Sequence, residues 1–104
     1  MALLKHPLLN SDSPHYDTGY RPLIMEIEEH LTVREMIGVC EFSIFKYEHR
    51  QKGQDESDIK KADTYNAYLK FLLEYLVTDH EHIFVSDAMN YEKIKWIGDT
   101  NDSY

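Results

Sequence analysis

Two stretches with the apolar spacing of amphipathic helices, joined by a short polar segment, limit most strongly what this chain can fold into. The first covers 32–50 and the second about 57–77, and in both the apolar side chains recur three and four residues apart. Gly53 lies between them and can adopt the left-handed backbone conformation that ends a helix. We therefore predict two helices joined by a tight reversal near Gly53.

The same spacing predicts helix starts and core faces. Thr32 and Glu35 match a capping box, and Asp55 or Ser57 can cap the second helix. The predicted inner faces comprise Val33, Met36, Ile37, Cys40, Ile44 and Tyr47 on the first helix, and Ile59, Ala62, Asn66, Leu69, Leu73 and Leu76 on the second. Further apolar residues widen the face of the second helix, namely Tyr65, Tyr68, Leu72 and Tyr75. This width indicates a partner helix or a subunit interface.

The two ends of the chain predict less regular structure. Residues 1–21 read as an extended arm that closes in a turn. Pro22 suits the first turn of a short helix to about His30, with Leu23, Ile24, Ile27 and Leu31 on an apolar face and Glu26, Glu28 and Glu29 on the other. Within 78–104, a short β-hairpin over 82–97 and a helical turn over 87–95 both fit the pattern. The prediction is a single, mainly α domain of about three helices over 1–104, with a helical core at 22–77.

Composition excludes several classes of protein. With 42% hydrophobic residues the chain is too apolar to be disordered, although its net charge of -8 is high for 104 residues. No run exceeds two consecutive cations, which disfavours direct nucleic-acid binding. Residues 1–54 carry six Lys/Arg against eight Asp/Glu, whereas 55–104 carry five against eleven. A cationic site is therefore expected near the middle of the chain.

The lone cysteine and the apolar runs bear on the compartment. Cys40 falls in the apolar pattern of the first helix, which predicts a small buried residue and no intrachain disulfide. Burial also argues against a role as a nucleophile. No apolar run approaches the length of a membrane span, and the leucines near the start do not form the core of a signal peptide. We expect a cytoplasmic protein without a membrane partner.

Cationic and aromatic side chains concentrate where the two main helices meet, in Ser43–Arg50 and Asp58–Tyr65. Lys46 and Arg50 are four residues apart, so they project from one face of a helix and a phosphate group could bridge them. The alternative is an ordinary solvated helix end, where cations favour the macrodipole. Asp58 and Lys61 have a similar alternative, an exposed ion pair along the second helix.

Two acidic or histidine pairs suggest metal chemistry more weakly. Glu26 and Glu29 have the spacing of paired carboxylates that hold Mg²⁺ beside phosphate, but the next helix lacks a second such pair. His80 and His82 could share a face of an extended segment, without a clear third ligand. A solvated acidic face and ordinary surface histidines are the simpler interpretations, and we assign no metal ligand.

The order of short motifs resembles a phage protein family known as domain of unknown function 3310, whose members are often labelled nucleotide kinases. The motifs that carry the resemblance are His15-Tyr16, Leu23–Glu29, Thr32–Met36, Ser43–Arg50, Lys52-Gly53 and Asp58–Tyr65. Together they cover about residues 14–76. At Phe42-Ser43 this chain departs from the Gly-Asn usual in the family.

The resemblance implies phosphate or nucleotide handling by Lys46, Tyr47, Arg50 and Lys61, with His15 and Tyr16 folding over a base or sugar. A nucleotide ligand would bring Mg²⁺ with it, and no other cofactor is implied. The chain has no Gly-x-x-x-x-Gly-Lys-Ser/Thr loop, so a kinase of the usual kind is not expected and the catalytic residues stay unassigned.

Three function classes remain from the sequence. The first is a small helical protein of phage type that binds a nucleotide or another phosphate-containing ligand, with a homo-oligomer as the expected state. The second is a non-enzymatic phage inhibitor of a host defence system, either an anti-CRISPR protein or a sponge for a nucleotide messenger. It would act by sequestration or through an acidic protein-binding surface. The third is a metal-dependent nucleotide hydrolase that uses Glu26 and Glu29.

Overall fold

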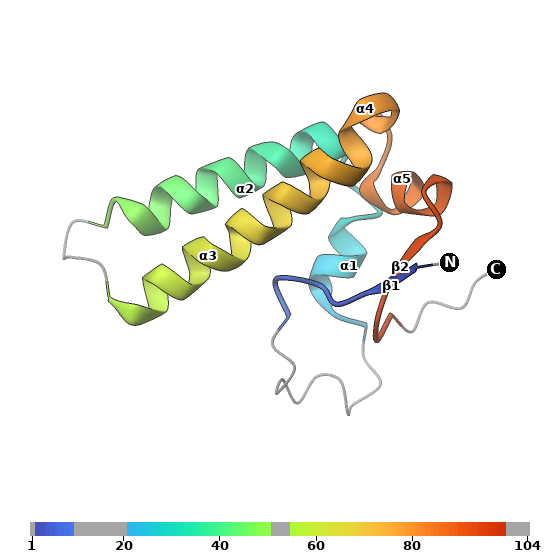
Figure 1. The fold of residues 1–104 in the computed structure, drawn as a ribbon. Coiled ribbons are helices and arrows are strands. Elements are labelled where there is room, and N and C mark those ends of the chain that lie inside the picture. Colours follow the sequence, from blue (N-terminus) through green and yellow to red (C-terminus); the bar gives the residue numbers. More distant parts are fainter. Residues whose placement is uncertain (1, 10–20, 51–54, 100–104) are drawn as a thin grey trace.

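A long helical hairpin is the main feature of the computed structural model (Figure 1). Its two helices, α2 (Val33–Glu48) and α3 (Glu56–Phe71), lie side by side and run antiparallel. The structure describes residues 2–9, 21–50 and 55–99. The reversal predicted near Gly53 lies outside the described residues, but the two helices that flank it confirm the mainly α architecture.

Side chains cap both helices of the hairpin as the sequence predicts. At the start of α2, the Glu35 backbone N–H donates to Thr32 Oγ1 at 3.1 Å and the Thr32 N–H donates to Glu35 Oε1 at 2.9 Å. At the start of α3, the Asp58 N–H donates to Asp55 Oδ1 at 2.8 Å. Each bond satisfies an amide that has no partner inside its helix.

The second arm of the hairpin continues past the predicted end near Val77. A single wide turn, η2 (Leu72–Leu76), follows α3 and leads into α4 (Val77–His80). The segment after α4 then crosses the start of α2, where the carbonyls of Ile83 and Glu81 accept the N–H groups of Val33 and Arg34, each at 3.0 Å. These bonds fix the C-terminal third of the chain against the hairpin, and α5 (Val85–Tyr91) begins directly afterwards.

The short C-terminal β-structure pairs with the beginning of the chain. Residues Ile94–Trp96 form β2, which lies parallel to β1 (Ala2–Leu4) with Ala2 opposite Ile94 and Leu4 opposite Trp96. Figure 1 shows the two strands side by side below α5. A local hairpin over 82–97 does not form, because residues 85–91 are helical and leave β2 without a neighbouring strand on that side. Part of the predicted extended arm is therefore a strand.

The hydrophobic core lies at the closed end of the hairpin, where α1 (Leu23–Ile27), η2, α5 and β2 meet α2 and the last part of α3. Its members are mostly aliphatic, with one cluster of aromatic rings: Met25, Val33, Met36, Cys40, Tyr68, Phe71, Leu72, Leu76, Val85, Ala88, Met89, Ile94 and Trp96. Cys40 is fully buried, as predicted. Burial raises the pKa of its thiol to about 12, with a smaller contribution from Glu41.

The buried face of α3 differs from the predicted one. Ile59 and Leu73 are about half exposed, and Asn66 is exposed, although the periodicity placed all three inside. Tyr68 and Leu72, which suggested a partner helix, are fully buried in the chain's own core. The reason is that α1, β2 and α5 cover the side of α3 that an isolated hairpin would leave open.

Candidate functional site

Three cationic side chains from two helices surround one tyrosine ring at the open end of the hairpin. Lys46 Nζ lies 4.6 Å from the centre of the Tyr47 ring, Lys61 Nζ lies 5.4 Å from it, and Arg50 Cζ lies 5.5 Å from it. These distances are within the range of cation–π attraction. We call Lys46, Tyr47, Arg50 and Lys61 the cation cluster.

Helix geometry and antiparallel packing account for this convergence. Lys46 and Arg50 are one turn apart near the end of α2, so they share a face. Tyr47 is half-buried and its ring stacks on that of Tyr65 of α3, with centroids 6.1 Å apart. Lys61 precedes Tyr65 by one helical turn, which brings its ammonium group to the same ring. The structure thus joins four of the six predicted site residues.

One carboxylate inside the hairpin partly balances the charge of the cluster. Asp58 is buried, and its Oδ1 lies 3.3 Å from Arg50 Nε. The predicted ion pair between Asp58 and Lys61 is therefore replaced by a pair across the two helices. Lys46 and Lys61 form no ion pair with any residue that the structure describes. Two ammonium groups near one guanidinium repel each other, and an anion placed among them would relieve that repulsion.

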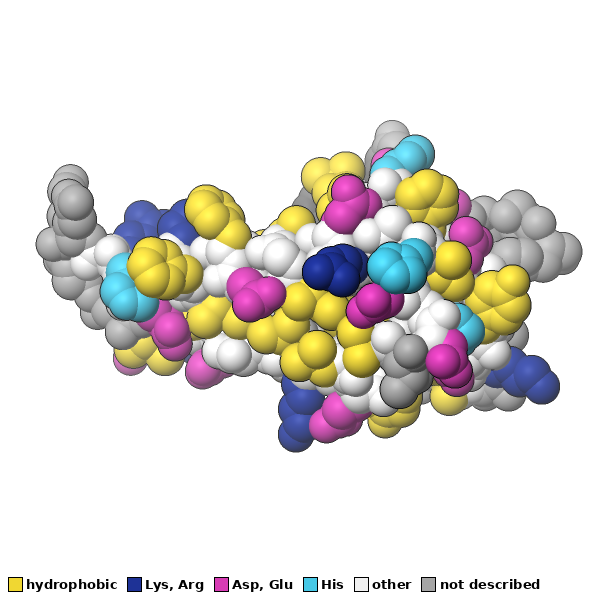
Figure 2. Space-filling model, turned by 90° about the horizontal axis from the view of Figure 1, so that it is seen from above, with side chains coloured by type: hydrophobic (Ala, Val, Ile, Leu, Met, Phe, Trp, Pro, Cys, Tyr) yellow, Lys and Arg dark blue, Asp and Glu magenta, His cyan; other side chains and the backbone are white. Residues whose placement is uncertain are grey.

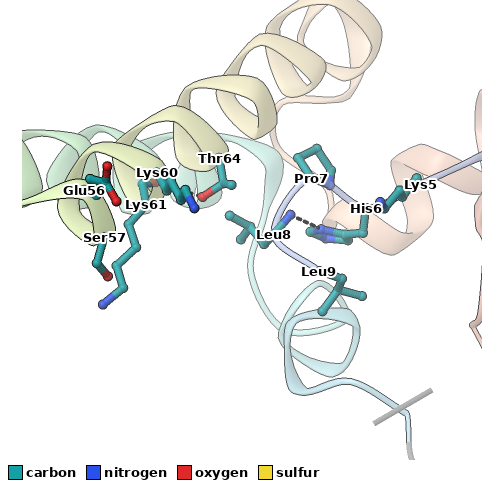
Figure 3. A pocket seen from close by; sticks show the side chains of 10 residues that line it. All are labelled: Lys5, His6, Pro7, Leu8, Leu9, Glu56, Ser57, Lys60, Lys61 and Thr64. Carbon is teal, nitrogen blue, oxygen red and sulfur yellow. Dashed lines mark hydrogen bonds between the residues drawn. The ribbon is translucent and has the colours of Figure 1, made fainter. Parts of the chain in front are cut away.

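A groove of about 920 Å³ adjoins the cluster on the outer side of α3 (Figure 3). One wall is the N-terminal segment after β1, with the apolar side chains Pro7, Leu8 and Leu9. The other wall is the first half of α3, and the groove's charged or polar lining residues are Lys5, Glu56, Ser57, Lys60, Lys61 and Thr64. Lys61 belongs to both the groove and the cluster, so the two form a continuous cationic surface.

The remaining predicted residues, His15 and Tyr16, lie outside the described residues. Lys5 and Lys60 were not predicted as site residues. Only the pairing of β1 with β2 brings the N-terminal segment to α3, and no local motif signals that pairing. For Lys60, its position next to Lys61 in the Asp58–Tyr65 segment was the available signal.

A second polar cluster lies in the core, at the opposite end of the hairpin. Glu28 is only 2% exposed, although the sequence placed it on the outer face of the first short helix. Its Oε1 accepts a hydrogen bond from Trp96 Nε1–H at 2.8 Å, and its Oε2 accepts one from His6 Nε2–H at 3.1 Å and one from the Tyr68 hydroxyl. We call Glu28, His6, Tyr68 and Trp96 the buried network. Three donors satisfy the carboxylate, which explains how it can be buried.

The hydrogen bonds also determine the protonation of His6. Its Nδ1 accepts the Leu8 backbone N–H at 3.2 Å, so the ring proton must lie on Nε2 and the imidazole is neutral. The ring packs between Trp96 and Tyr68, at centroid distances of 4.3 and 4.8 Å. Burial, with the charge of Glu28 as a second cause, raises the pKa of Tyr68 well above its usual value. With both imidazole nitrogens engaged, the network has a structural role.

Residues considered as metal ligands pair instead with other side chains of the fold. Glu29 bonds to Arg21, which also donates from Nε to Asp99 at 2.9 Å and links the start of α1 to the residues after β2. His80 lies 3.4 Å from a carboxylate oxygen of Glu92. Across 2–9, 21–50 and 55–99, no three His, Cys, Asp or Glu side chains gather as a metal site would require.

The fold and the cation cluster together define the chain as a small helical-hairpin protein with a cationic surface where the hairpin opens. A model of the family described as "Protein of unknown function (DUF3310)" matches residues 10–67, more than half of the chain. The chain belongs to this family, as the order of its motifs suggested. Neither the curated proteins nor the solved structures contain a match. Within the described residues, none of the helices is long and apolar enough to span a membrane.

The family match covers one of the two polar clusters. It includes all four residues of the cation cluster and ends before Tyr68. Of the buried network it includes Glu28 alone. The part of the chain that defines the family therefore carries the complete surface cluster and one member of the buried one.

Proposed function

We propose that this protein binds a phosphate-containing small molecule at the cation cluster, and that a nucleotide is the form the site suits best. The observation that carries the proposal is the convergence of Lys46, Arg50 and Lys61 on one ring, with a single carboxylate among the described residues to balance them. Guanidinium and ammonium groups are the side chains that proteins use to hold phosphate oxygens.

The surroundings of the cluster support a ligand larger than inorganic phosphate. Tyr47 and Tyr65 stack on each other, and their rings provide an aromatic surface next to the cations. The groove beyond Lys61 adds the apolar side chains of Pro7, Leu8 and Leu9 and the further cation Lys60. A phosphate held at the cluster would leave room in the groove for the organic part of the ligand.

A thermal-shift screen tests the proposal directly. The full chain is heated with inorganic phosphate and with mono-, di-, tri- and cyclic nucleotides, each with and without Mg²⁺. A compound present at 100 times its Kd should stabilise the fold by about 2.7 kcal/mol, a rise of several degrees in Tm for a domain of this size. The rise should shrink with added salt, because exposed charges are screened.

Two alanine variants make the screen specific to the cluster. Lys46→Ala should abolish the shift. Lys70→Ala is the matched control, since Lys70 is also exposed but lies further along α3 and pairs with Glu74. The proposal fails if no phosphate compound raises Tm, or if Lys46→Ala and Lys70→Ala respond equally. A shift that requires Mg²⁺ would direct the next experiment to turnover of the nucleotide.

A further inference from the structure

The side of α2 that faces away from α3 carries a row of exposed apolar side chains that the hairpin does not use. Phe42 and Phe45 are 66% and 63% exposed, and Val39, one turn earlier, is 39% exposed. The ring of His49 stacks on Phe45 with centroids 4.1 Å apart and extends the row by one turn. Hydrophobic side chains also reach the surface in the view onto α2, where they alternate with charged ones (Figure 2). We call Val39, Phe42, Phe45 and His49 the outer stripe.

Gly38 lies beside this stripe and has no role inside the protomer. A Cβ atom added at Gly38 would meet nothing within 4 Å, and its φ is not positive, so neither packing nor backbone conformation requires glycine there. Glycine in the middle of a helix lowers helix stability. Its small size would be useful only to something that approaches α2 from outside.

The charges along α2 identify the chemistry of that partner. Glu35 lies seven residues before Phe42, and His49 lies seven residues after it, with Lys46 one turn earlier. Acid is thus at one end of the stripe and base at the other, at equal distances from Phe42. An antiparallel copy of α2 would place unlike ends together, whereas a parallel copy would place Glu35 against the partner's Glu35. This is the arrangement of a two-fold symmetric interface.

We propose that two copies of this chain associate through antiparallel contact of their outer stripes, with the two-fold axis near Phe42. The phenyl rings of Phe42 meet at the axis, and Val39 of each protomer lies opposite the partner's Phe45. Gly38 gives the partner helix room to approach closely, as small residues do at helix–helix contacts. The interface covers the apolar side chains and leaves the Tyr47 and Lys61 side of the cation cluster open.

Sedimentation velocity on the full chain across the micromolar range tests the dimer. The wild type should sediment with twice the mass of one chain, and Phe42→Glu should sediment as a monomer. Leu23→Glu is the matched control, since Leu23 is 69% exposed on α1, outside the stripe, and its substitution should leave the dimer intact. A monomeric wild type, or equal loss of the dimer in both variants, would overturn the proposal.

Two further variants separate the interface from folding and locate the axis. Gly38→Gln should keep or raise the Tm of the monomer while raising the dissociation constant of the dimer at least tenfold. Phe42→Cys should form a disulfide between protomers under mild oxidation, because Cys40 is buried and does not compete. Leu23→Cys should stay uncrosslinked. Unchanged dimerisation in Gly38→Gln, or the same crosslinking in both cysteine variants, would contradict the proposed geometry.

Discussion

The two ends of the helical hairpin treat charge in opposite ways. At the closed end, the carboxylate of Glu28 is buried and accepts three hydrogen bonds, from His6, Tyr68 and Trp96. At the open end, Lys46 and Lys61 are exposed and form no ion pair with any described residue. The first arrangement uses every donor and acceptor to hold the fold together, whereas the second leaves positive charge available to an external molecule.

The contrast teaches how burial distinguishes structural polar residues from binding residues. A charge removed from water must be matched inside the protein, because an unmatched one is strongly destabilising. A charge that stays in water has no such requirement, so a group of like charges there contributes little to folding. The two clusters should therefore respond differently to mutation, and three sets of substitutions test this, in order of decreasing effect on stability.

Glu28→Ala should have the largest effect. Removal of the carboxylate leaves the buried donors of His6, Tyr68 and Trp96 without their acceptor, and we expect a loss of about 3–5 kcal/mol in the free energy of unfolding. Urea denaturation followed by circular dichroism measures it. Glu26→Ala, at an exposed position of the same short helix, should change the stability by less than about 0.5 kcal/mol. Equal losses in the two variants would remove the distinction drawn between the clusters.

Tyr68→Phe should have an intermediate effect, because it deletes one donor to the carboxylate and keeps the ring. Hydrogen bonds to charged groups contribute about 1.5–3 kcal/mol, and the same denaturation experiment should show a loss of that size. Tyr65→Phe is the control, since no hydrogen bond of the Tyr65 hydroxyl is found within the described part of the chain. If Tyr68→Phe were as stable as the wild type, the hydroxyl of Tyr68 would not stabilise the buried carboxylate.

Neutralising the cation cluster should have the smallest effect on folding. Lys46→Gln and Lys61→Gln should each change the free energy of unfolding by less than about 0.5 kcal/mol, with a slight gain at low salt because like charges are removed. Lys70→Gln provides the baseline for an exposed lysine elsewhere on the same arm. A loss above about 1 kcal/mol at Lys46 or Lys61 would show that the cluster has a structural role after all.

Local signals in the sequence predicted the hairpin and four residues of its open end. Thr32 and Glu35 specify their capping box within four residues, and Asp55 specifies the start of α3 in the same way. Lys46 and Arg50 are one turn apart on any helix, so their common face required no tertiary information. The antiparallel direction then brings Lys61 close, because the connection between the helices is short.

Contacts between distant parts of the chain were not predictable in this way. Glu28 looked like one of three acidic residues on a solvated face, since its partners are 22, 40 and 68 residues away in the sequence. Tyr68 looked like a candidate for a subunit interface, because nothing local showed that β2 would place Trp96 against it. The outer stripe was also missed, since the core face of α2 could be assigned without Val39, Phe42 and Phe45.

What the sequence determined by itself is the set of elements whose cause is local: the capped helices, their antiparallel direction and the common face of Lys46 and Arg50. Only the tertiary structure decided which carboxylate is buried, which strand pairs with β2 and which side of α3 is covered. The physical reason is that capping and helical spacing depend on neighbours within one or two turns. Burial depends instead on segments that meet only when the whole chain has folded.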